Sequence, residues 1–145
     1  MNRPLEDAPG KRAANAPPPR RLEVLLVEDS ENDALLIDDA LRRAGFAPSV
    51  TRVDSAAGLR AALAESPWQA ILSDWRLPGF SGLDAFAICR ECGPDVPFLL
   101  LSGAMDEALA AAAAKAGIRG CVSKDHLERL AGMLAELGIG SLNPD

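Results

Sequence analysis

The sequence predicts an α/β domain in which five strands alternate with five helices, so that helices cover a parallel sheet. Two observations carry this prediction. Short apolar runs recur along the chain from Leu22 onward, and the stretches between them have apolar residues at helical spacing. The chain has 145 residues, of which 48% are hydrophobic, which is room for one domain with a full core.

The strands are expected where apolar residues run together for four or five positions. They are residues 23–27, 49–53, 70–73, 97–101 and 120–123. Because these runs are almost continuously apolar, they are typical of strands that are buried on both faces of a parallel sheet.

The helices are expected between the strands, with local signals for where they begin and end. They cover about 31–44, a stretch from Ser55 to before Pro67, one from Ser81 to Gly93, about 107–116, and one that opens at Asp125 and ends at Gly138. Ser81 is followed three residues later by Asp84, and Asp125 by Glu128, which is the spacing of a helix-capping box.

Composition and charge limit the kinds of partner. The net charge of −6 argues against binding to nucleic acid or to an anionic membrane surface. No apolar run reaches membrane-spanning length, and the N-terminus lacks the apolar segment of a signal peptide, so a cytoplasmic protein is expected. Residues 1–20 contain five prolines and no hydrophobic pattern. We therefore expect a disordered tail over 1–20, one domain over 21–138, and a short C-terminal tail over 139–145.

Polar residues directly follow four of the predicted strands, and open parallel sheets bind ligands at the carboxyl ends of their strands. Glu28 and Asp29 follow the first strand, Asp74 the third, Ser102 the fourth and Lys124 the fifth. Each has an ordinary explanation when taken alone, as a helix cap, a turn residue or a surface charge. Taken together, they place three carboxylates, a hydroxyl and an amine at one edge of the sheet.

Carboxylates at one edge repel each other, by about 4 kcal/mol for a pair at ~4 Å and an effective dielectric constant near 20. Such a cost is tolerated where a cation binds, and carboxylate, carbonyl and water oxygens suit Mg²⁺. A lysine and a hydroxyl beside the metal could hold the oxygens of a phosphoryl group, and a carboxylate can itself be the nucleophile that forms an acyl phosphate. Asp74 is the best placed nucleophile, because its strand should be central.

Four segments together resemble the receiver domain of two-component response regulators, including the single-domain chemotaxis type. They are 24-VLLVEDS-30, 71-ILSDWRLPGFSG-82, 99-LLLSGA-104 and 120-GCVSK-124. The resemblance implies a flavodoxin-like, doubly wound (βα)5 fold with the strand order 2-1-3-4-5. It also implies a signalling domain and not an enzyme, which takes a phosphoryl group from a histidine kinase or a histidine phosphotransfer protein and acts on another protein.

The resemblance assigns roles to individual residues, with Mg²⁺ as the cofactor. Asp74 would be the phosphoacceptor and Asp29 a metal ligand, and Glu28 would be an acidic neighbour that acts indirectly on the metal. The backbone carbonyl of Arg76 would be the third protein ligand of the metal. Ser102 would be the switch hydroxyl, and Lys124 the amine that binds the phosphoryl group.

One departure leaves other functions open. The family usually has an aromatic residue three positions before the lysine, where this chain has Cys121. A binding module that does not need phosphorylation is therefore an alternative. A Mg²⁺-dependent phosphatase with an aspartate nucleophile is another, although the position where such an enzyme needs a general acid holds Arg76.

Overall fold

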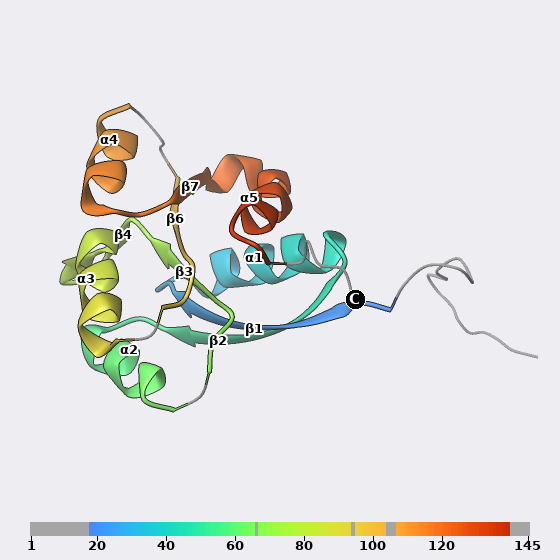
Figure 1. The fold of residues 1–145 in the computed structure, drawn as a ribbon, viewed down its shortest axis with the longest axis horizontal. Coiled ribbons are helices and arrows are strands. Elements are labelled where there is room, and N and C mark those ends of the chain that lie inside the picture. Colours follow the sequence, from blue (N-terminus) through green and yellow to red (C-terminus); the bar gives the residue numbers. More distant parts are fainter. Residues whose placement is uncertain (1–17, 66, 94, 104–106, 140–145) are drawn as a thin grey trace, which may run out of the picture.

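The computed structural model describes residues 18–65, 67–93, 95–103 and 107–139 (Figure 1). Most of the tail expected over 1–20 and all but the first residue of the tail expected over 139–145 lie outside the described residues. None of the helices that the structure describes has the length and apolar content of a membrane-spanning segment.

A parallel sheet of five strands forms the centre of the described part of the chain. The strands are β1 (Arg20–Val27), β2 (Phe46–Val53), β3 (Ala70–Asp74), β6 (Phe98–Ser102) and β7 (Gly120–Ser123). Their spatial order is β2-β1-β3-β6-β7, and every neighbouring pair is parallel. Counted among these five strands alone, this is the order 2-1-3-4-5, so the predicted fold is confirmed.

Helices cover both faces of this sheet (Figure 1). They are α1 (Glu31–Arg43), α2 (Ala56–Leu63), α3 (Gly82–Cys92), α4 (Glu107–Ala116) and α5 (Leu130–Glu136). Alternate residues of β1 belong to two separate cores: Leu26 packs with α1 and α5, whereas Leu25 packs with α2, α3 and α4. Because side chains alternate across a strand, β1 supplies both cores at once and is buried over most of its length.

Two strands begin earlier than the sequence predicts. β1 starts at Arg20, and β2 starts at Phe46, in register with it. The predicted starts were wrong by three residues because charged residues and Pro48 interrupt the apolar pattern there. A proline is tolerated in β2 because β2 is an edge strand, where one side of the backbone has no partner in this sheet.

The helix start predicted at Asp125 was also wrong. A 3-10 segment covers Lys124–Arg129 first, and α5 begins only at Leu130. The side chain of Ser123 accepts a hydrogen bond from the backbone N–H of Asp125, so the cap lies two residues before the expected one. His126 has the non-helical dihedral angles φ −134° and ψ 52°, which interrupts the helical path. The capping box of Ser81 in α3, by contrast, is confirmed.

The turn after Asp74 is a short hairpin. Strands β4 (Arg76–Leu77) and β5 (Phe80–Ser81) pair antiparallel around it. Gly79 has a φ of +82°, a conformation that favours glycine. The hairpin returns the chain at once to α3, whose residue Gly82 donates a hydrogen bond to the carbonyl of Trp75 at 2.8 Å.

Candidate functional site

The carboxyl ends of the parallel strands bring acidic and basic side chains together, as the sequence predicts. Asp74 is the last residue of the central strand β3, and Glu28 and Asp29 directly follow the neighbouring strand β1. Lys124 directly follows β7, which lies two places from β3 on its other side. Asp54, at the end of the edge strand β2, is exposed and does not belong to the group of carboxylates.

Lys124 is the centre of the charged cluster. Its Nζ lies 2.7 Å from Oδ2 of Asp33, 2.8 Å from Oε1 of Glu28 and 3.2 Å from Oδ2 of Asp74. Only 16% of the Lys124 side chain is exposed. Burial alone would lower the pKa of Lys124, but the close contacts with the negatively charged Asp33, Glu28 and Asp74 raise it overall, so the amine is a cation at neutral pH. The explanation of Lys124 as an ordinary surface charge is therefore wrong.

Glu28 is a buried carboxylate whose surroundings only partly satisfy it. Its side chain is 1% exposed, and its Oε2 accepts a hydrogen bond from the backbone N–H of Ser30 at 3.1 Å. Its Oε1 contacts Lys124 as an ion pair but has no partner with hydrogen-bond geometry. Burial raises the pKa of Glu28, and the contacts with Lys124 and Ser30 counteract that rise. A further positive charge at this oxygen would stabilise the ionised form.

Three carboxylates meet the requirements of a small divalent cation. Oxygen atoms of Glu28, Asp29 and Asp74 all lie within 4.8 Å of one another. Hard oxygen donors of this kind, one of them buried without a hydrogen bond, fit Mg²⁺. Glu28 lies within this carboxylate group, and its indirect action on the metal remains a prediction. Arg76 lies in β4, two residues beyond Asp74, and its role as a carbonyl ligand remains a prediction.

Ser102 lies on β6, next to the strand of Asp74, and Cys121 lies on the edge strand β7. Ser102 ends β6, is 4% exposed, and is in register with Ser123 of β7. Cys121 is half-buried, pairs with Leu100, and packs against the core shared by α2, α3 and α4. Burial raises the pKa of the Cys121 thiol, so this side chain is a neutral apolar group in the position of the usual aromatic ring.

Asp33 is the site residue that the sequence analysis missed. It lies in the first turn of α1, and its backbone N–H donates to the Ser30 side chain, so it has the ordinary appearance of an acid near a helix N-terminus. Its contact with Lys124 joins residues 91 positions apart. The sequence offers no local signal for that contact, because it depends on the turn after β7.

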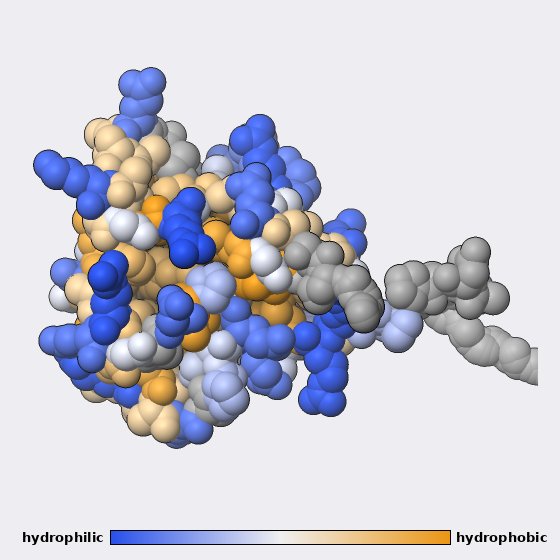
Figure 2. Space-filling view, in the orientation of Figure 1, coloured by the Kyte–Doolittle hydropathy of each residue, from blue (hydrophilic) through white to orange (hydrophobic). Residues whose placement is uncertain are grey.

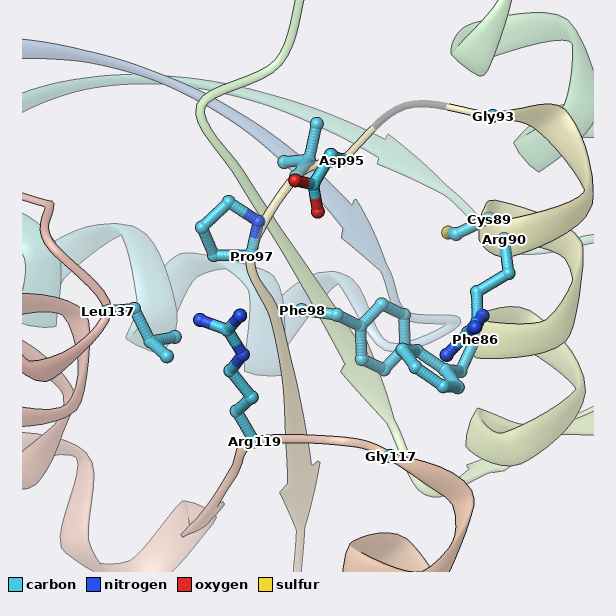
Figure 3. A pocket seen from close by; sticks show the side chains of 11 residues that line it. Phe86, Cys89, Arg90, Gly93, Asp95, Pro97, Phe98, Gly117, Arg119 and Leu137 are labelled. Carbon is cyan, nitrogen blue, oxygen red and sulfur yellow. The ribbon is translucent and has the colours of Figure 1, made fainter.

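A separate hollow of about 570 Å³ lies near the opposite ends of the strands (Figure 3). Phe98, at the start of β6, and Phe86 line it with their rings edge to face at 5.1 Å, and Arg119 points toward it just before β7. Figure 2 shows apolar residues exposed among charged ones in the middle of this view of the molecule. The grouped carboxylates are thus at the other edge of the sheet, and this hollow is not part of the charged site.

Comparison with known proteins places this chain in one family. A family model described as the response regulator receiver domain matches residues 24–135. The chain therefore belongs to the family of response regulator receiver domains, which are signalling domains of two-component systems. The resemblance drawn from the four sequence segments is confirmed.

Two curated relatives agree with this assignment. The chain is 35% identical over 101 residues to the photosynthetic apparatus regulatory protein RegA of Rhodovulum sulfidophilum, which covers 70% of this chain and 54% of that protein. It is 29% identical over 80 residues to the response regulator receiver protein CpdR of Brucella abortus (strain 2308), which covers 55% of this chain and 65% of that protein. The chain thus spans between half and two thirds of the length of these relatives.

Solved structures show the same fold. The chemotaxis response regulator CheY4 of Vibrio cholerae superposes with a TM-score of 0.68 at 21% identity, over 81% of this chain and 98% of that one. The receiver domain of a sensor histidine kinase from Pseudomonas aeruginosa superposes with a TM-score of 0.63 at 27% identity, over 81% of this chain and 98% of that one. That second structure has a magnesium ion coordinated in its active-site cleft.

Proposed function

We propose that this domain accepts a phosphoryl group on Asp74 in a Mg²⁺-dependent reaction in the cytoplasm, and that residues 21–138 are the unit that does so. The donor is the phosphohistidine of a histidine kinase or a histidine phosphotransfer protein. The phosphorylated domain then acts by contact with another protein or passes the group on. The observation that carries the proposal is the position of Asp74 at the end of the central strand, grouped with two other carboxylates and 3.2 Å from Lys124.

The transfer exchanges one bond to phosphorus for another. An Oδ lone pair of Asp74 forms the new O–P bond, the N–P bond of the donor histidine breaks, and the histidine nitrogen keeps the electron pair of that bond. Asp74 enters as a carboxylate, so the chain has no proton to remove before attack. The transfer thus requires mainly correct position and compensation of the negative charge on the phosphoryl oxygens.

The residues around Asp74 supply that compensation. Asp29, Asp74 and Glu28 would hold Mg²⁺, with the Arg76 carbonyl as a further ligand, and the ion when bound neutralises charge on the phosphoryl oxygens. Lys124 donates to a phosphoryl oxygen from the other side, and the Ser102 hydroxyl donates to another. The Lys124 ammonium already faces Asp74, with its Nζ 3.2 Å from Oδ2 of that residue.

The first helix offers a surface for the phosphodonor protein. Leu35 and Leu36 of α1 are large apolar side chains that are exposed to solvent, in the helix that begins directly after Asp29 and Ser30. A helix of a histidine-bearing bundle could cover these leucines while its phosphohistidine reaches Asp74. The leucines thus support a protein donor over a small molecule.

The test is phosphorylation by a small donor. Incubation with acetyl phosphate and Mg²⁺ is expected to add one phosphate by intact-protein mass, and Asp74→Asn is expected to abolish the addition. Asp54→Asn is the matched control, since Asp54 also follows a strand of the same sheet but lies exposed at the edge, and it should be phosphorylated like the wild type. Phosphate that persists in Asp74→Asn would contradict the assignment.

The half-buried Cys121 favours one other candidate, a receiver-like module that binds its partner without phosphorylation. The same experiment separates the candidates. A stable added phosphate supports the phosphoacceptor, and release of inorganic phosphate without accumulation supports a phosphatase. No reaction in the presence of Mg²⁺ supports the phosphorylation-independent module.

A further inference from the structure

Lys124 lies among three carboxylates and donates a hydrogen bond to one of them, Asp33. An ammonium group has three N–H donors, and three carboxylates lie within 3.2 Å of its nitrogen. A phosphoryl group on Asp74, as in the proposed function, would bring new anionic oxygens to the same ammonium. Lys124 can then turn toward the phosphoryl group by releasing one of these carboxylates.

Asp33 is the carboxylate that costs least to release. The Glu28 side chain is 1% exposed, so loss of its lysine would leave a buried charge without a cation. Asp74 carries the phosphoryl group and stays beside the lysine. The Asp33 side chain is 36% exposed, so water can replace the ammonium, and its position in the first turn of α1 favours a negative charge in any case.

We propose that Asp33 is a positioning residue that holds Lys124 before phosphorylation and competes with the phosphoryl group for it. Because of this competition, the domain binds a phosphoryl group at Asp74 less tightly than it would without the Asp33 carboxylate. It also means that phosphorylation breaks the contact between the turn after β7 and the first turn of α1. This contact offers a route for the signal into α1 that does not use an aromatic ring at position 121.

Removal of the Asp33 charge should therefore make Lys124 more available. The probe is beryllofluoride with Mg²⁺, which mimics a phosphoryl group on an aspartate, and the readout is the fluorescence of Trp75 next to Asp74. Asp33→Asn keeps the size of the side chain and the backbone N–H that donates to Ser30. It is expected to bind beryllofluoride about two- to fivefold more tightly than the wild type, as a partly exposed ion pair of the usual strength predicts. Asp33→Ser is expected to act in the same direction.

The control distinguishes the loss of the contact with Lys124 from the general electrostatic effect of removing a negative charge. Glu31→Gln removes another negative charge from the first turn of α1, but Glu31 is exposed and contacts Arg52 at 3.5 Å and not Lys124. It is expected to change the affinity by less than about twofold. A spectroscopic readout tests the broken contact itself: in ¹H–¹⁵N spectra, beryllofluoride should move the amide signals of residues 31–34 in the wild type and move them less in Asp33→Asn.

The outcomes distinguish this inference from the function on which it rests. A wild type that binds no beryllofluoride overturns both. If the wild type binds it and both Asp33 variants bind with equal or weaker affinity, the phosphoacceptor stands and the role of Asp33 is wrong. An equal gain in Glu31→Gln and Asp33→Asn overturns the role of Asp33 in the same way.

Discussion

Replacement of Lys124 by glutamine is expected to destabilise the fold, although the residue belongs to the functional site. The substitution keeps an extended polar side chain and removes the cation that forms ion pairs with the carboxylates of Glu28, Asp33 and Asp74. The three carboxylates then face each other without compensation. Of the three, Glu28 is buried, whereas Asp33 and Asp74 are partly solvated.

The size of the effect follows from that burial. Removal of one partner of a fully buried ion pair costs about 3–5 kcal/mol, and exposed pairs contribute about 0–1 kcal/mol. Because one of the three partners is fully buried, we expect a loss of about 2–4 kcal/mol in the free energy of unfolding. For a domain of this size, that loss corresponds to a fall in melting temperature of roughly 10 °C. The loss should be larger at pH 8 than at pH 5, because burial already raises the pKa of Glu28 and protonation relieves the uncompensated charge.

The assay is thermal unfolding in EDTA, followed by repetition with Mg²⁺. Arg42→Gln is the control, because it breaks the exposed ion pair with Asp38 in α1 and should change the melting temperature by no more than about 2 °C. Mg²⁺ is expected to stabilise Lys124→Gln more than the wild type, since the ion replaces the missing positive charge. The reasoning is refuted if Lys124→Gln melts within about 2 °C of the wild type in EDTA.

Two further substitutions test the packing and electrostatics around Asp74. Glu28→Gln is expected to raise the stability of the fold at pH 7.5 without Mg²⁺, because a carboxyl whose pKa lies above its ordinary 4.5 destabilises the fold once it is ionised. This gain in stability should vanish as the pH falls toward 4.5. A gain that grows on acidification would contradict the reasoning. Gly82→Ala would place a Cβ 2.7 Å from the carbonyl oxygen of Asp74 and against Leu100, so we expect a loss of about 1–3 kcal/mol by chemical denaturation. Gly132→Ala, where a Cβ meets nothing within 4 Å, should instead be neutral or stabilising, and equal effects at the two glycines would exclude the steric explanation.

Most of the charged site was predictable because its residues directly follow strands. Glu28, Asp29, Asp74 and Lys124 each end an apolar run, and a parallel sheet brings all such ends to one edge. The start of α3 was predictable for a similar reason, since the capping box of Ser81 is made within four consecutive residues.

Predictions failed at the boundaries of elements, which depend on turn geometry and on strand pairing. Asp125 has the local appearance of a helix start, yet a 3-10 turn occupies that place and α5 begins at Leu130. In the same region, Lys124 reaches back across the site to Asp33 of α1. The start of β1 at Arg20 likewise depends on its pairing with Phe46 of β2, and not on an apolar side chain.

The sequence by itself determined the fold class, the edge of the sheet that carries the site and the family, because each depends on residue order and on periodic patterns. The tertiary structure decided which charges compensate one another. That Glu28 is buried without a hydrogen bond at Oε1, and that Asp33 shares Lys124 with Asp74, depends on distances between residues of β1, β3, α1 and the turn after β7. Burial and ion pairing are properties of the packed chain, and for these residues no local pattern in the sequence specifies them.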